Sequence, residues 1–225
     1  MPISPARKAR TRVEIVEHAA RLFRVRGHAG TNIDDIMLAA GLTRGAFYAH
    51  FTSKDDLFAE TIGAGNGLTS RLRAGKVEAV LDEYLDKDSL AATALACALA
   101  TLPGDVARGP LAAQLEYANQ LHAAIGELAR GRRRKLDADA TAAAILAIGA
   151  VILARASGDR RLGDWLLRCA RRTAKEILKP RVSPARPKSK SRRKSAAARR
   201  PKLAARSRGG RAAASPKARS SGSRR

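Results

Sequence analysis

The chain contains little of what builds disulfide frameworks, metal sites or catalytic centres. Only two cysteines occur among its 225 residues, Cys97 and Cys169, without a Cys-x-x-Cys pair or a histidine cluster beside them. That pattern argues against a structural zinc site and fits a reducing compartment. The sequence also lacks a phosphate-binding glycine loop, a nucleophile elbow and any metal-ligand spacing. We therefore expect no enzyme, no catalytic residues, no cofactor and no metal.

Acidic and aromatic residues are scarce as well. The sequence has 44 Lys or Arg against 20 Asp or Glu, a net charge of +24. A protein this basic associates with polyanions, and nucleic acid is the leading candidate. Five of the eight aromatic residues lie in the first 60 positions. Any ligand cavity in the rest of the chain is therefore expected to be aliphatic, with a few polar groups.

Strand-forming and membrane-entering segments are not expected. Runs of β-branched residues are missing, which favours an all-α fold. The first residues contain no apolar core of a signal peptide. The longest apolar run, 142–154, is too short to span a bilayer. We expect a soluble intracellular protein with no membrane partner.

The positive charge is concentrated at the C-terminus. Residues 181–225 contain 17 Lys or Arg and no acid, which leaves +7 for residues 1–180. Ser, Ala and Pro recur there, and Leu203 is nearly the only large hydrophobic residue. Such a segment cannot bury enough apolar surface to offset its ordering entropy. Residues 180–225 are therefore expected to form a disordered basic tail.

Residues 31–54 have the pattern of two short helices joined by a turn. Thr31 is placed to cap the first helix, and Asp34 and Asp35 fall in its first turn, where carboxylates suit the helix dipole. Gly41 is suited to end that helix in a left-handed conformation. Thr43 then begins a second helix. A helix opening with Thr and Arg can approach a phosphate backbone and a base edge together.

The flanking segments complete a small helical domain. A basic arm over residues 1–12 leads into a helix over 11–26, with a buried stripe expected at Val13, Val16, Ala20 and Phe23. A further helix should run from Lys54 to about residue 72, after Ser53 as its cap. It contains glycines at 63, 65 and 67, and interior glycine costs a helix about 1 kcal/mol. A break at these glycines and close packing against a neighbouring helix are both open.

The run GLTRGAFYAHF at 41–51, followed by SKDDL at 53–57, resembles the DNA-binding domain of the TetR family of bacterial repressors. The resemblance is strong over residues 11–60 and extends to the rest only by general plan. It implies a helix-turn-helix domain over 13–60 and a helical ligand-binding and dimerisation domain over 61–179. Met37 stands where the family commonly has alanine, so the packing of the two short helices could differ. Leu42, Phe47 and Phe51 are assigned to the core.

Carried over by position, the family's DNA contacts fall on seven residues at the two short helices and the start of the next. Chemistry agrees, since hydroxyls, cations and helix N-termini bind phosphate, and an arginine can reach guanine O6 and N7. The residues are Thr31, Thr43, Arg44, Gly45, Tyr48, His50 and Lys54.

The remainder of the chain reads as helices with short breaks at 103–104, 109–110, 131 and 157–158. By the resemblance, the last two helices, 137–156 and 162–178, would pair with those of a second copy. The small residues Ala143, Ala147, Gly149, Ala150 and Ala154 would allow close approach. A monomer could equally use the same alanines internally.

The effector cannot be named from the sequence. Cys97 lies in a segment similar to one near the effector site of some family members, and a thiol of lowered pKa there could sense an electrophile. A cysteine between alanines and leucines is more often simply small and buried, and that interpretation is favoured.

The sequence as a whole predicts a cytoplasmic, nucleoid-associated DNA-binding regulator. Its expected partners are a double-stranded DNA operator, a second copy of itself and a small-molecule effector. We expect a dimeric, ligand-responsive repressor whose basic tail adds non-specific DNA affinity. The alternative is an architectural nucleoid protein in which the histone-like tail supplies most of the affinity.

Overall fold

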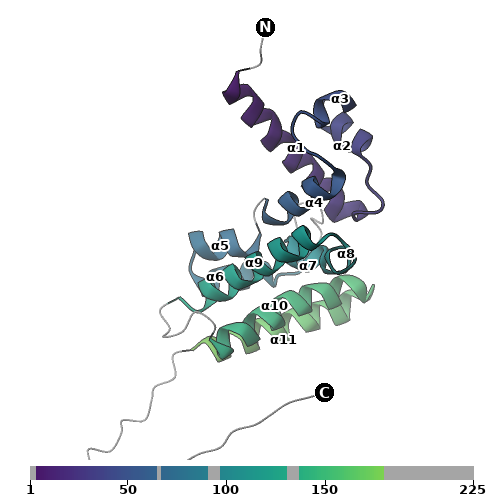
Figure 1. Cartoon of the computed structure of the whole chain (residues 1–225). Coiled ribbons are helices and arrows are strands. Elements are labelled where there is room, and N and C mark those ends of the chain that lie inside the picture. Colours follow the sequence, from purple (N-terminus) through teal and green to yellow (C-terminus); the bar gives the residue numbers. More distant parts are fainter. Residues whose placement is uncertain (1–3, 65–66, 91–96, 131–136, 180–225) are drawn as a thin grey trace, which may run out of the picture. The chain divides into compact units, whose positions relative to one another are not determined.

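A computed structural model describes residues 4–64, 67–90, 97–130 and 137–179 (Figure 1). Within these ranges the chain is helical and has no strand, which confirms the all-α prediction. The elements are α1 Pro5–Arg26, α2 Ile33–Ala39, α3 Arg44–Phe47, α4 Lys54–Gly63, α5 Leu68–Ala74, α6 Val77–Tyr84, the 3-10 helix η1 Asp88–Leu90, α7 Ala98–Thr101, α8 Pro103–Arg108, α9 Leu111–Leu128, α10 Ala138–Ala156 and α11 Arg160–Leu178. The tail expected over 180–225 lies outside the described residues.

The first helix begins earlier than the sequence predicted. Ser4 caps α1 by accepting the N–H of Arg7 at 3.3 Å, and Pro5 at the first helical position needs no hydrogen-bond partner for its nitrogen. Most of the predicted basic arm is therefore the first two turns of α1. The buried stripe consists of Ile15, Val16, Ala19, Ala20 and Phe23, whereas Val13 is exposed. The prediction for Val13 was wrong because Arg12, which contacts Phe51 and the His50 carbonyl, occupies the packed position at this turn of the helix.

Helices α1 to α4 form the head of the protein, which has its own core. Phe23, Phe47 and Phe58 are fully buried at its centre, and Phe51 lies beside them. Met37 is also buried, so the core accommodates its bulk where the family commonly has alanine. Leu42 is half-buried against this cluster. The predicted core positions in the turn region are thus confirmed.

The glycine cluster does interrupt the fourth helix. Helix α4 ends at Gly63, and α5 begins at Leu68 after Gly67 in extended backbone conformation. Gly63 also has a packing role, because a Cβ there would lie 2.9 Å from Oε1 of Glu116 on α9. Both interpretations of the cluster therefore hold at different positions, while Gly65 lies outside the described residues.

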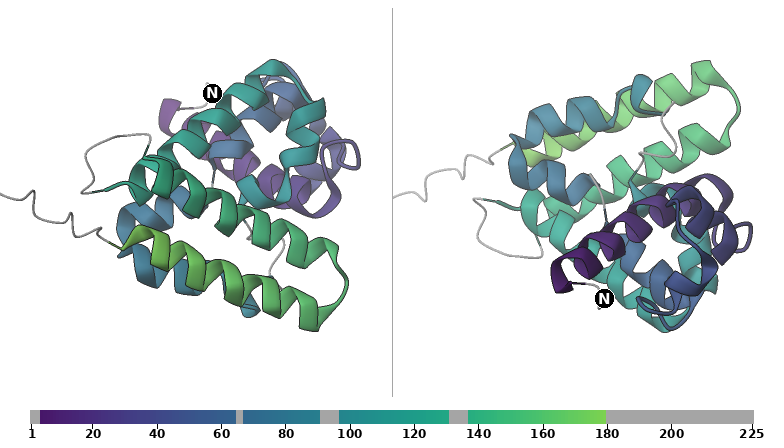
Figure 2. Two further views of the ribbon diagram at one scale, coloured as in Figure 1. Left: turned by 90° about the horizontal axis from the view of Figure 1, so that it is seen from below. Right: turned by 90° about the horizontal axis from the view of Figure 1, so that it is seen from above.

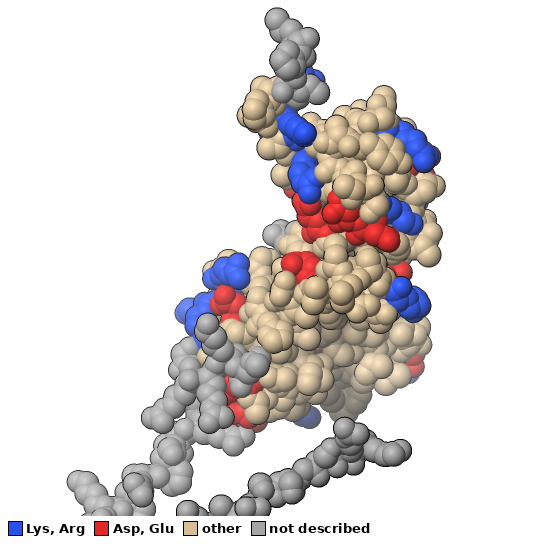
Figure 3. Space-filling view, in the orientation of Figure 1, with Lys and Arg blue, Asp and Glu red and all other residues tan. Residues whose placement is uncertain are grey.

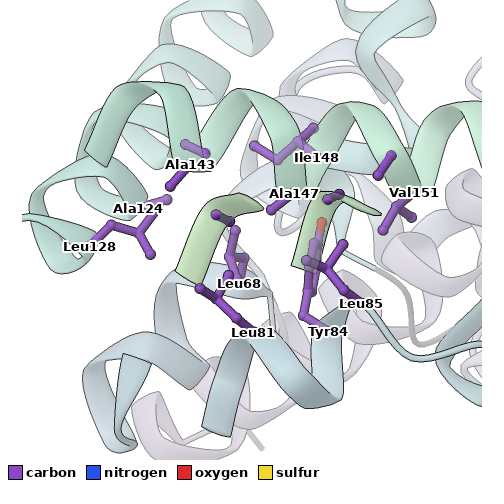
Figure 4. Close-up of a cluster of buried hydrophobic side chains, with 14 of the residues drawn as sticks. Leu68, Leu81, Tyr84, Leu85, Ala124, Leu128, Ala143, Ala147, Ile148 and Val151 are labelled. Carbon is purple, nitrogen blue, oxygen red and sulfur yellow. The ribbon is translucent and has the colours of Figure 1, made fainter. Parts of the chain in front are cut away.

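Helices α5 to α11 form the body, shown in two further views in Figure 2. Helices α10 and α11 pack along each other, and α9 contacts α4, α5 and α10. Figure 4 shows the centre of the body core, where side chains of α5, α6, α9 and α10 meet. Its labelled members are Leu68, Leu81, Tyr84, Leu85, Ala124, Leu128, Ala143, Ala147, Ile148 and Val151.

Four of the alanines expected at a dimer contact serve the protomer itself. Ala143, Ala147, Ala150 and Ala154 are buried in the body core, which lets α10 approach its neighbours closely. Gly149 faces open space, with no atom within 4 Å of a Cβ built there. The internal alternative is thus the correct one for the alanines. The apolar side chains that α10 exposes are larger, namely Ile145 and Leu153.

Helix α10 is, within the described residues, the one helix long and apolar enough by length and composition to cross a membrane. The helix extends beyond the apolar run 142–154, which was predicted to be too short by itself to span a bilayer. Eight of its residues are buried against the rest of the body. That burial is typical of a core helix in a water-soluble helical bundle.

Candidate nucleic-acid interface

The turn between α2 and α3 is closed by a glycine in the left-handed conformation. Gly41 has φ of 68°, and its N–H donates to the carbonyl of Leu38 at 3.0 Å. The next N–H, of Leu42, donates to the carbonyl of Met37 at 2.8 Å. This is the arrangement of a Schellman cap, which satisfies the last carbonyls of α2 and fixes the direction of α3. The predicted role of Gly41 is confirmed.

Helix α3 opens onto solvent with three exposed residues, Thr43, Arg44 and Gly45. Thr43 is the N-cap residue, but its hydroxyl makes no capping hydrogen bond. The helix spans only Arg44–Phe47, and a turn follows it, so it is shorter than the sequence predicted. Buried Phe47 anchors it to the head core. The hydroxyl of Thr43, the guanidinium of Arg44 and Gly45 therefore lie together at a fixed position. We call these three residues the mouth of α3.

Arg44 is oriented by two neighbours. Its Nη1 lies 2.6 Å from Oδ2 of Asp34 on α2, an ion pair in which both side chains are more than half exposed. Hydrogen bonding to Tyr48 and the charge of Asp34 raise the pKa of Arg44. Exposed ion pairs contribute little to stability, so exchanging Asp34 for a DNA group costs little. The pair holds the guanidinium beside α2 at the mouth of α3.

Tyr48 and His50 follow α3 in the turn. The Tyr48 side chain is 59% exposed, and its ring packs edge-on against Phe47 with centroids 5.3 Å apart. His50 is half-buried, and burial together with Lys8 and Arg12 lowers its pKa. Positive groups therefore surround His50 on the α1 side. This is the environment that a phosphate group, rather than a cation, would enter.

Arg12 of α1 ties this turn to the rest of the head. Its guanidinium donates to the His50 carbonyl, forms an ion pair with Glu60 of α4 and lies 4.1 Å from the ring centroid of Phe51. One side chain thus connects α1, the end of the α3 turn and α4. The sequence placed Arg12 in a basic arm and gave no signal of this role, because its contacts are 38 and 48 positions away.

Two predicted phosphate contacts have structural tasks in the head. The N-cap of α2 is Asn32, whose side chain accepts the N–H of Asp35 at 2.7 Å, so the expected cap at Thr31 was wrong. The Thr31 hydroxyl is buried and donates to the carbonyl of Gly27 at 2.9 Å. A phosphate contact by that hydroxyl does not fit its burial.

Lys54 contacts the turn between α1 and α2, in which Thr31 lies. Its ammonium donates to the carbonyls of His28 at 2.9 Å and of Thr31 at 3.0 Å. An ammonium has three donors, so one remains for a phosphate. The side chain holds the turn between α1 and α2 and leaves only part of its charge for DNA.

His28 contacts residues of both the head and the body. Its ring lies 4.6 Å from Phe58 and 5.7 Å from Phe23, centroid to centroid, and its Nε2 lies 2.9 Å from Oδ1 of Asp55. Its backbone N–H donates to Oδ1 of Asp105 on α8 at 3.1 Å. Burial and Lys54 lower the pKa of His28, against the opposing effect of Asp55 and Asp105. A body residue therefore fixes the end of the first helix of the head.

Charge is divided along the visible face of the molecule. Figure 3 shows acidic side chains gathered where the head meets the body, with basic side chains on the head above them. Helix α4 carries three exposed acidic residues, Asp55, Asp56 and Glu60. A polyanion would be repelled from this band and is directed toward the mouth of α3.

The geometry of the head has a clear counterpart among known proteins. Residues 15–61 match the family described as bacterial regulatory proteins, tetR family. The match begins inside α1 and ends near the end of α4, so it covers the helices that build the interface.

Residues 15–61 are a DNA-binding domain of the TetR family.

Curated relatives of this TetR domain are transcriptional regulators. The chain is 50% identical over 50 residues to the regulator AcrR of Shigella flexneri, covering 22% of this chain and 23% of AcrR. It is 51% identical over 47 residues to the regulator TtgR of Pseudomonas putida, covering 21% of this chain and 22% of TtgR. The matched segment thus spans less than a quarter of the length of these two relatives, which are regulators and not enzymes.

The fold similarity extends beyond the TetR domain. The crystal structure of a TetR-family transcriptional regulator from Cytophaga hutchinsonii superposes with a TM-score of 0.58 at 23% identity, covering 79% of this chain and 98% of that one. The body therefore has the helical architecture of these regulators. Regulators of this family are soluble cytoplasmic proteins that bind operator DNA, act as dimers and respond to small-molecule effectors.

Sequence reasoning identified the mouth of α3 but not the residues that hold the TetR domain in place. His28 and Asp105 carry no motif, and their contact joins positions 77 apart in the chain. The one available signal was Gly27, where φ is 74° and a Cβ would lie 3.2 Å from Oδ1 of Asp105. A glycine at a helix end was read as a stop signal only.

Proposed function

We propose that the chain is a dimeric, ligand-responsive repressor that binds an operator through the mouth of α3. The observation that carries the proposal is the exposed group of Thr43, Arg44 and Gly45 on a helix anchored by buried Phe47. Arg44 is proposed to read a guanine in the major groove, because the donors of an exposed guanidinium match the O6 and N7 acceptors of that base. Thr43, Tyr48, His50 and the free donor of Lys54 are proposed to bind phosphate.

Dimerisation is proposed to use the apolar side chains that α10 and α11 expose. Ile145, Leu153, Leu162 and Trp165 are 66%, 56%, 45% and 57% exposed, and they recur at helical spacing on their two helices. Helices α10 and α11 pack along each other, and large apolar side chains left exposed on adjoining helices mark an interaction site. A dimer is also what an operator requires, since two recognition helices must enter major grooves about 34 Å apart.

The effector is proposed to act through α4. A cavity of about 150 Å³ lies between the end of α4, α5, α7 and α9, and Ile62, Leu68, Cys97 and Gln120 are among its lining residues. Cys97 is buried there and accepts the N–H of Leu68 at 3.4 Å. The first residue of α4, Lys54, holds the turn of the TetR domain. A ligand that favours a different position of α4 would therefore shift the head, by no more than its differential affinity for the two states.

The repressor proposal is tested by selecting genomic fragments that the full chain binds and comparing the selected duplex with a scrambled one. We expect at least about a thousandfold preference for the selected duplex at physiological salt. Equal affinity for both duplexes contradicts the proposal.

A second candidate function rests on the charge of the tail. With +17 in residues 181–225, the tail could supply most of the DNA affinity of an architectural nucleoid protein. Residues 1–181 form a compact unit of their own, so the chain can be compared with and without residues 182–225. The repressor is supported if the truncated protein keeps its sequence preference and its DNA affinity merely depends less steeply on salt concentration. Loss of sequence preference together with affinity supports the architectural function.

A further inference from the structure

Helix α11 has three distinct faces. Gly163, Leu167, Ala170 and Ala174 are buried on the face that packs into the protomer. Leu162 and Trp165 belong to the exposed apolar face proposed for dimerisation. At 100° per residue, the remaining third of the helix surface carries nearly all of its charge. Basic residues predominate on this charged face: Arg160, Arg161, Arg168, Arg171, Arg172, Lys175 and Lys179, with Asp164 among them.

The charged face divides into an inner and an outer part. On the inner side, Lys175 pairs with Asp82 of α6 at 2.8 Å, and Arg171 borders a groove that also contains Asp86 and Asp164. Arg168 lines the edge of the same groove and stands between the two parts. On the outer side, Arg161, Arg168, Arg172 and Lys179 are all exposed. Their spacings of seven, four and seven residues keep them in line along the helix. We call these four residues the outer row.

The three arginines of the outer row have no ion-pair partner within residues 4–64, 67–90, 97–130 and 137–179. Arg168 and Arg172 are one turn apart, a like-charge spacing that destabilises a helix slightly. Other exposed arginines in the same structure are paired, as Arg26 is with Asp35 and Arg44 with Asp34. The fourth member of the row, Lys179, forms an ion pair with Glu176, so the row presents three guanidinium groups without an ion-pair partner among the described residues.

We propose that the outer row of α11 is a second DNA-binding surface, separate from the mouth of α3. The row extends about 27 Å along the helix, the length of about eight base pairs of duplex. Guanidinium groups suit phosphate oxygens because they donate two parallel hydrogen bonds. The outer row leads at its C-terminal end into the sequence that carries +17, so the two basic segments are continuous in the chain.

The position of the outer row separates it from the operator. Helix α11 packs against α10 and α6, and Figure 1 shows both of the last two helices on the side of the body away from α1 to α3. The row borders the exposed apolar face, because Trp165 lies one turn from Arg161 and from Arg168. A dimer formed through that face therefore has one outer row along each edge of its contact. One dimer could thus hold an operator with its heads and a second duplex with its two outer rows.

The experiment is a capture assay with the full-length chain. A duplex selected by the protein is immobilised, the protein is added, and retention of a labelled duplex of unrelated sequence is measured over a range of salt concentrations. The test variant is Arg161→Gln/Arg168→Gln/Arg172→Gln. The matched control is Arg73→Gln/Lys76→Gln/Arg108→Gln, which removes the same charge from exposed positions elsewhere on the body.

We expect the test variant to bind the immobilised duplex like wild type and to capture the second duplex more weakly, since the basic tail is unchanged. Removing three phosphate contacts lowers the salt slope of capture by about 2.7. The control variant keeps capture. Equal capture by the test variant and wild type overturns the proposal, as does an equal loss in the control variant. Binding to vesicles of anionic lipid is measured in parallel. A test variant that keeps DNA capture and loses only its affinity for these vesicles also overturns the proposal. Failure of the operator proposal is distinct, since it appears as loss of preference for the immobilised duplex.

Discussion

The backbone N–H of His28 donates to Oδ1 of Asp105 across 3.1 Å, so a carboxylate of the body fixes the end of the first helix of the head. The same turn receives the ammonium of Lys54 on its carbonyl groups. A donor and two acceptors of one short turn are thus satisfied by two side chains from different helices. The turn that precedes the DNA-binding helices is held from both sides.

Asp105→Ala is expected to lower the free energy of unfolding by about 1–2 kcal/mol, because it leaves the His28 N–H without its charged acceptor. Asp105→Asn keeps an oxygen acceptor and should cost less. Chemical denaturation of both variants measures the difference. Glu78→Ala, at an exposed position of α6, is the control and should change stability by less than about 0.5 kcal/mol. Equal stability of Asp105→Ala and wild type contradicts the role of the contact.

Truncation of Arg44 and truncation of Tyr48 are expected to weaken DNA binding in different ways. Arg44→Ala should relax the preference at one base pair of the selected site, at a cost of about 1–3 kcal/mol on the preferred base. Tyr48→Ala should weaken all site variants by similar factors, because a phosphate contact carries no sequence information. Binding to a panel of single-base operator variants separates the two patterns. A uniform loss for Arg44→Ala would count against base reading by this residue.

Two glycines near the interface should respond oppositely to alanine. Gly41 has φ of 68°, so Gly41→Ala strains the backbone and is expected to cost about 1 kcal/mol of stability. Gly45 lies within α3 with nothing within 4 Å of an added Cβ, so Gly45→Ala should leave stability unchanged or raise it. DNA binding should nevertheless weaken in Gly45→Ala, because the new methyl group occupies the mouth of α3. Thermal unfolding and duplex binding, measured on both variants, check the pair.

His28 should make the protein less stable in mild acid. Its pKa in the folded protein lies below the ordinary value of 6.5, chiefly through burial. As the pH falls below 6.5, the unfolded chain takes up the proton first, so the free energy of unfolding decreases in that window. His28→Gln should flatten the decrease between pH 7 and the lowered pKa. His122→Gln on α9 is the substitution control. An unchanged pH profile in His28→Gln would contradict this assignment.

The exposed apolar face of α10 and α11 should decide the oligomeric state. Leu153→Glu/Trp165→Glu places charges where a partner would pack and is expected to give a folded monomer, because both side chains are exposed in the protomer. Leu111→Glu, at an exposed position of α9, should leave the dimer intact. Sedimentation of the variants distinguishes these outcomes. A double variant that stays dimeric shows that the pairing surface lies elsewhere.

Local sequence patterns predicted where helices begin and end and which of their residues are buried. They did not predict which side chains of different helices contact one another. Gly41, Ser53 and the spacing of Phe47 and Phe51 predicted caps and core positions that the structure confirms. Thr31 was misread, because two adjacent residues can both cap a helix and only packing decides between them.

The contacts of Arg12, His28 and Asp105 could not be found from the sequence. Each depends on side chains brought together from distant segments, and none of these residues belongs to a motif. The alanines of α10 show the same difficulty. Small residues permit close packing, but the sequence does not say which neighbour approaches.

The interruption between Gly63 and Leu68 gives the chain a natural junction. Residues before it include the segment that matches the tetR family, whereas the similarity reported above for the residues after it is one of fold. A chimaera that joins this head to another body should therefore be cut between these two positions. It must also carry a carboxylate in place of Asp105, because the exchanged body has to supply the acceptor for the turn at His28.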